Sequence, residues 1–187
     1  MSGRVPRLGG GPAVLSVADQ GYFFGYTLVG TGPISTQNIT ISNNAIRVFQ
    51  FVLPFRITVR KIGWDMTTGI DGSHSSMGIY SADGNSLLVH SGAVSTAIAD
   101  QGIQVTTVTE VVLNPAAYYF AQTSTSVSVN ARIWNLGSRP QNLLNAASVA
   151  ERCGTAANAS SGGVLPATLG TITDATGINP SMCVFVT

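Results

Sequence analysis

The sequence predicts an all-β protein, a β-sandwich of the jelly-roll type. Two observations lead to this fold class. Apolar and polar residues alternate with a period of two over several segments, which is typical of strands with one buried face. Turn residues separate these segments about every eight to twelve residues, as in sandwiches built from about seven to nine short strands. We assign the sandwich to residues 46–187 and treat residues 1–45 as an extended N-terminal arm.

The strongest strand signal lies in residues 47–66. Its odd-numbered positions are apolar from Phe49 to Val59, and after Arg60 and Lys61 the apolar positions are the even-numbered 62, 64 and 66. A slip of one residue moves every later side chain to the other face of a sheet unless the strand bulges. The sequence therefore predicts a β-bulge at Arg60/Lys61.

A β-hairpin is predicted directly after this strand. Residues 77–80 and 87–92 are strand-like and flank the turn 81–86, which contains Asp83-Gly84. This dipeptide is a strong hairpin signal because glycine readily takes the positive φ that such turns need.

The remaining strands follow in order. Residues 103–113 form a long strand whose odd-numbered residues, Ile103 to Leu113, share one face, and Asn114-Pro115 ends it because proline has no N–H for the ladder. Further strands are expected at 117–123, 126–134 and 181–187. A capping box at Ser138 predicts a short helix that runs to Glu151. The predicted core contains Phe55, Ile57, Val59, Trp64, Ile79, Val127, Val129 and Ile133.

The arm differs in amino-acid composition from the rest of the chain. Gly- and Pro-rich breaks at 8–12 and 30–33 enclose a cluster of aromatic residues, and such breaks oppose regular structure. We predict that this cluster is an assembly interface buried against another chain. The alternative is that it belongs to a first strand pair of the same sandwich. The cluster consists of Tyr22, Phe23, Phe24 and Tyr26.

Charge is scarce along the whole chain. Charged residues make up 9% of the sequence and the formal net charge is +1, whereas ordinary soluble domains carry about 25% charged residues. Nucleic acids and anionic membranes are recognised by clustered Lys and Arg, so neither is expected as a partner. A net charge near zero favours self-association, and we expect a symmetric homo-oligomer, specifically a homotrimer.

No pattern in the sequence points to catalysis or to a cofactor. Neither His74 nor His90 has a partner at metal-ligand spacing, and the eight acidic residues are scattered. We expect no metal, no cofactor and no enzymatic activity. Cys153 and Cys183 are interpreted either as two buried thiols or as a bridge that forms after release into an oxidising medium.

Several motifs carry a family resemblance. FVLPFRITVRKIGWDMTTG is followed by GIYSADGNSLL, VHSGAVSTA, LNPAAYYFAQ and a GGVLPATL loop before an apolar last strand. This order resembles the β-sandwich modules of bacteriophage tail-fibre and virion-surface proteins. The resemblance implies a non-enzymatic structural protein located in the virion and assembled in the host cytoplasm.

Within that setting, we expect a capsid decoration or cement protein that docks through the arm. The alternative is a tail, fibre or spike component that adsorbs to host-surface glycan. The partners implied are copies of the chain itself and other virion proteins, such as the major capsid protein or a tail subunit.

Overall fold

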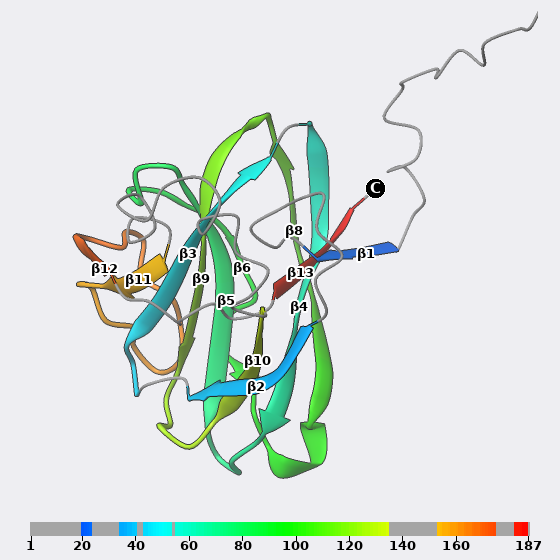
Figure 1. Cartoon of the computed structure of the whole chain (residues 1–187), viewed down its shortest axis with the longest axis vertical. Helices are drawn as coiled ribbons and strands as arrows, with labels where there is room; N and C mark the ends of the chain where they lie inside the picture. Colours follow the sequence, from blue (N-terminus) through cyan, green and yellow to red (C-terminus); the bar gives the residue numbers. More distant parts are fainter. Residues whose placement is uncertain are drawn as a thin grey trace, which may run out of the picture.

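The computed structural model describes residues 20–23, 34–40, 43–53, 55–134, 153–174 and 182–186. Within these residues the protein is a β-sandwich of two antiparallel sheets (Figure 1). The predicted all-β sandwich is confirmed, and the jelly-roll type stays a prediction.

The first sheet, called the β4 sheet here, is arranged around its long central strand. β4 pairs with β8 along almost its whole length on one side, whereas its other side is shared by β13 and β10. β1 then pairs with β13, and β2 pairs with β10. The strands are β1 (Gln20–Phe23), β2 (Ile34–Thr40), β4 (Ile57–Thr68), β8 (Gly102–Leu113), β10 (Asn130–Trp134) and β13 (Met182–Val186).

The second sheet, called the β9 sheet here, has the order β12-β11-β3-β9-β5-β6, with β7 also paired to β5. A short 3₁₀ turn at Ile98–Asp100 connects β7 to β8 and so leads the chain from one sheet to the other. The strands are β3 (Ile46–Leu53), β5 (His74–Ser81), β6 (Leu87–His90), β7 (Val94–Ser95), β9 (Ala116–Ser124), β11 (Cys153–Ala156) and β12 (Ile172–Asp174).

The bulge predicted in β4 is confirmed. The register of β4 against β8 shifts between Val59 and Lys61, and the pairing of β4 with β13 shifts at the same place. Val59 and Ile62 are both fully buried although their positions differ in parity. The extra residue therefore keeps the apolar side chains on the inner face before and after the slip.

Strand β8 slips as well, which the sequence did not reveal. Residues 108–110 lie opposite Arg60 alone, so the inner face passes from Val108 to Val111 and Leu113. Our prediction that residues 103–113 keep one parity is wrong. As a result Ile103 and Leu113, placed on one face by the sequence, lie on opposite faces, with Ile103 65% exposed and Leu113 buried.

The predicted hairpin is confirmed as β5, a five-residue connection (82–86) and β6. Gly84 has a φ of 71°, and its N–H donates to the Ser81 carbonyl at 2.9 Å. The Asp83 carboxylate accepts hydrogen bonds from the Ser81 hydroxyl at 2.5 Å and from the Asn85 N–H at 3.0 Å. These bonds lower the pKa of Asp83, the Ser81 hydroxyl most of all.

Most of the predicted core is confirmed. Ile57, Val59, Trp64, Ile79 and Val129 are buried. Phe55 is half-buried and packs against this core, whereas the side chain of Ile133 lies outside the described part of the structure.

Val127 was predicted to be buried, and this is wrong because the side chain is 58% exposed. The Ser124 hydroxyl accepts from the Ser126 N–H and the Ser126 hydroxyl accepts from the Ser128 N–H, both at 3.2 Å. These local bonds hold a turn, so the strand begins only at Asn130.

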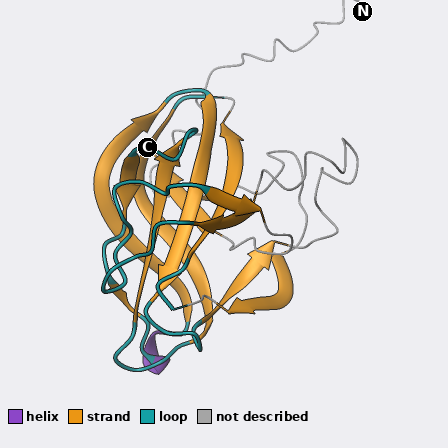
Figure 2. Cartoon of the chain, turned by 90° about the vertical axis from the view of Figure 1, so that its left-hand side faces the viewer, coloured by secondary structure: helices purple, strands orange, loops and turns teal. Residues whose placement is uncertain are grey.

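A second apolar cluster covers the outer face of the β9 sheet. Leu165 and Leu169, from the loop after β11, are buried against outward-facing residues of β3, β5 and β9. The Tyr80 hydroxyl donates to the Pro166 carbonyl at 2.6 Å, and the Leu169 N–H donates to the Gly84 carbonyl at 2.8 Å. Loops on this side of the molecule cross in front of the strands in Figure 2. Strand β3 is therefore buried on both faces, which explains its nearly continuous apolar run.

The predicted arm contributes two strands to the sandwich of its own chain. β1 pairs with β13 and β2 pairs with β10. The predicted closing strand at 181–187 is confirmed as β13. The predicted helix from Ser138 to Glu151 lies outside the described residues, and the domain boundary at residues 45/46 stays a prediction.

Candidate functional site

The predicted assembly interface divides between described and undescribed residues. Tyr22 and Phe23 lie in β1, where they are register partners of Val184 and Cys183. Phe24 and Tyr26 lie outside the described residues. The pairing of β1 is what the alternative, a strand pair of the same sandwich, expects. Burial of these aromatic residues against another chain stays a prediction.

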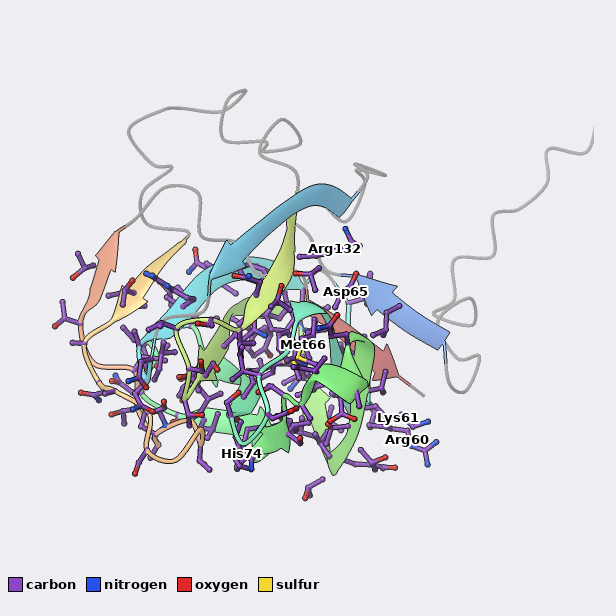
Figure 3. All side chains as sticks on the ribbon, turned by 90° about the horizontal axis from the view of Figure 1, so that it is seen from below. Arg60, Lys61, Asp65, Met66, His74 and Arg132 are labelled. Carbon is purple, nitrogen blue, oxygen red and sulfur yellow. The ribbon has the colours of Figure 1, made fainter. Side chains whose placement is uncertain are left out.

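The histidines and several acidic residues occupy turns and strand ends. His90 Nδ1 accepts a hydrogen bond from the Gly92 N–H at 3.1 Å, and the Asp71 carboxylate accepts one from the Ile98 N–H at 3.0 Å. His74 begins β5 and is exposed, as Figure 3 also shows. Among the described residues, no three His, Cys, Asp or Glu side chains form a group that could hold a metal ion. The His90 bond closes a local turn, and the Asp71 bond joins two separate loops, so both have structural roles.

Two ion pairs join neighbouring strands of the β4 sheet. Arg132 Nε lies 2.5 Å from Asp65 Oδ2, and Arg60 Nε lies 2.9 Å from Glu110 Oε1. In Figure 3, Asp65 and Arg132 lie side by side, while Arg60 and Lys61 project from another part of the ribbon. The first pair links β10 to β4 and the second links β4 to β8, so both pairs connect neighbouring strands.

A polar row crosses the inner face of the β9 sheet at one end. Arg47 and Gln122 are register partners, and Arg47 Nη1 donates to Thr155 Oγ1 at 2.6 Å. Burial lowers the pKa of the Arg47 guanidinium. Gln122 is only 2% exposed, and its side-chain amide has no hydrogen-bond partner among the described residues. Arg47 and Thr155 are half-buried, whereas the Gln122 amide is shielded from water, so the row offers no open site at Gln122.

The exposed edge of the β4 sheet is a more accessible candidate. β8 pairs with β4 on one side, and none of the described strands pairs with its other side. β8 and β4 run along the same side of the molecule in Figure 1. The β8 segment Gly102–Thr107 exposes Ile103 and Val105 to solvent, with exposed fractions of 65% and 45%. We call this segment the β8 edge.

Hydrophobic periodicity does not mark the β8 edge in the sequence. Apolar and hydroxyl residues occur at both parities of this strand, and Val108 and Val111 lie on the same inner face only because the strand slips between them. One signal does exist in the sequence. The strand contains no Lys, Arg or Pro over twelve residues, whereas natural edge strands commonly carry such residues to block further pairing.

The comparisons with known proteins add no relative. No family model, curated protein or solved structure matches this chain. Among the described residues, no helix is long and apolar enough to cross a membrane. The fold and the β8 edge together define a β-sandwich with an accessible, uncharged sheet edge.

Proposed function

We propose that this protein is a non-enzymatic structural subunit of a bacteriophage particle, a capsid decoration or cement protein. The observation that carries the proposal is the β8 edge, a strand segment without charge that exposes apolar side chains on a sandwich. Exposed apolar patches and unpaired strand edges are the features through which sandwich proteins contact other chains. The resemblance of the sequence motifs to virion-surface modules supplies the setting.

The distribution of covered and open surfaces supports an assembly role. On the β9 sheet, the loop with Leu165 and Leu169 already buries the outer face. The β4 sheet ends instead in strands without a second described partner, β8 on one side and β1 and β2 on the other. In the proposed function, contacts with other chains use these edges, and the partners are further copies of the chain and the major capsid protein.

The experiment that tests this function locates the protein in purified particles. Antibody-gold labelling and quantitative mass spectrometry of gradient-purified particles are expected to find the protein on the capsid at a fixed copy number. Particles from a strain that lacks the gene serve as the control. Finding the protein only in the particle-free lysate would contradict the proposal. Label confined to the tail would instead favour the tail, fibre or spike role.

A further inference from the structure

We propose that two copies of this protein associate by antiparallel pairing of their β8 edges about a two-fold axis. This inference concerns the partner of one strand and does not depend on the virion function. It starts from the exposure of Ile103 and Val105 and from the side of β8 that pairs with none of the described strands. No backbone hydrogen bond outside the β4 ladder is recorded for any residue of β8 in the described part of the chain.

The composition of the β8 edge suits a second copy of the same strand. Like charges directly opposite one another destabilise a strand pair, and Lys or Pro on an edge blocks pairing. The segment Gly-Ile-Gln-Val-Thr-Thr contains neither charge nor proline. The only charged residue of β8 is Glu110, which lies within the slip at residues 108–110, outside the β8 edge, and pairs with Arg60. A self-contact through the β8 edge therefore brings no like charges together.

Symmetry restricts how two β8 edges can pair. In an antiparallel ladder, alternate residues direct their N–H and C=O groups to the same neighbour. Residues of one parity in the β8 edge therefore have free backbone groups, and a two-fold axis must pass through a residue. With the axis at Gln104, Ile103 faces Val105 of the second copy. With the axis at Val105, the two Val105 residues face each other. These two registers have the axis closest to the middle of the segment 102–107, and both place Val105 in an apolar cross-strand pair.

The size of the contact predicts its strength. A strand segment of six residues is about 20 Å long, and its edge offers less than the ~800 Å² per partner of a standard stable interface. We therefore expect a reversible dimer in dilute solution. Such a contact becomes effective where other contacts already hold copies side by side, because linked sites bind at a high effective concentration.

Sedimentation velocity of the full chain over an about hundredfold range of concentration tests the proposal, because mass action makes a reversible dimer concentration-dependent. The average mass is expected to rise from one 19.3 kDa chain toward two. Val105→Lys places a charge at the contact and is expected to raise the concentration of half-dimerisation by about tenfold or more, or about 1.4 kcal/mol. Val112→Lys is the matched control because it lies on the same strand beyond the slip with a similar exposure of 42%.

Circular dichroism and thermal unfolding establish that both variants are folded. If Val105→Lys does not fold, Ile103→Lys replaces it, since that side chain is more exposed. Hydrogen exchange adds a direct readout, because backbone N–H groups of residues 102–107 are expected to exchange more slowly as concentration rises. A wild-type chain that stays monomeric, an oligomer whose mass Val105→Lys leaves unchanged, or equal effects of both lysines would overturn the proposal.

Discussion

Val127 and Val129 show that alternation alone does not decide which residues are buried. Both belong to one alternating run in the sequence, yet Val127 is exposed and Val129 is fully buried. The serine hydroxyls at 124 and 126 bond to backbone N–H groups two residues later and hold a turn where the pattern predicts a strand. Short polar side chains compete with the strand ladder in this way.

The two valines give a matched pair of stability variants. Val129→Ala is expected to lower the free energy of unfolding by about 2–4 kcal/mol, because it removes buried methyl groups and leaves a cavity. Val127→Ala makes the same chemical change at the surface and is expected to alter it by less than about 0.5 kcal/mol. Urea unfolding of both variants measures the difference. Similar values for the two would show that Val129 is not packed in the core.

Asp83 provides a test by pH. Hydrogen bonds from Ser81 and Asn85 stabilise its carboxylate and lower its pKa in the folded state. When the pKa of a carboxyl group is lower in the folded state than in the unfolded state, the group stabilises the fold at pH values above the unfolded-state pKa. This stabilisation is lost as the pH falls through the folded-state pKa.

The stability difference between wild type and Asp83→Asn is therefore expected to be largest at neutral pH and to shrink in acid. Thermal unfolding across this pH range measures it. An NMR titration of the Asp83 carboxyl group gives its pKa directly. A pKa at the usual value for aspartate would show that the turn does not stabilise the carboxylate.

At the scale of elements, the predictability of β4 and β8 differs for a physical reason. In β4 the buried residues are large and apolar on both sides of the slip, so the change of parity is visible in the sequence. In β8 the inner face includes Gln104 and Thr106, and the outer face includes Ile103 and Val105. The strand lies at a sheet edge where less burial is needed, so hydrophobicity no longer marks the inner face. For the same reason, hydrophobicity did not mark the candidate site, and its one signal in the sequence is the lack of Lys, Arg and Pro in the strand.

Other features depend on contacts between distant segments. The loop that contains Leu165 and Leu169 is rich in small residues, and its role in covering β3, β5 and β9 follows only from the assembled sheet. Similarly, an aromatic strand such as residues 20–23 can bury against its own chain or another chain with the same local pattern. The backbone of β1 pairs with β13 of its own chain, which the local sequence pattern could not show.

Deletion of Arg60 tests the bulge in β4. Without the extra residue, Ile62, Trp64 and Met66 move to the outer face, and three large buried side chains are lost from the core. The deletion variant is expected to show no cooperative unfolding transition.

Arg60→Ala is the control because it keeps the backbone length. It removes only the partly exposed ion pair with Glu110, and pairs of this kind contribute up to about 1 kcal/mol. Cooperative thermal unfolding of the deletion variant at a temperature close to that of wild type would contradict the role assigned to the bulge.

At the scale of the whole molecule, the sandwich is asymmetric. The β9 sheet carries a covering loop, whereas the β4 sheet has open edges at β8 and at β1 and β2 within the described residues. The two edges are suited to different contacts. The β8 edge pairs with a second copy in our proposal, and the N-terminal segment next to β1 is the predicted docking element on the particle.

Truncation of the N-terminal segment separates assembly from folding. Deletion of residues 1–33 removes β1, but β13 keeps its ladder with β4 from Val59 to Trp64, so the sandwich is expected to stay folded. The same deletion removes the aromatic cluster around Tyr22 and is expected to abolish incorporation into particles.

Deletion of residues 1–19 is the control, because it retains β1 and this cluster. Circular dichroism measures folding, and quantitative mass spectrometry of purified particles measures incorporation. Normal incorporation of the longer truncation would remove the docking role. Loss of folding would show instead that the sandwich requires β1 as a strand of its own.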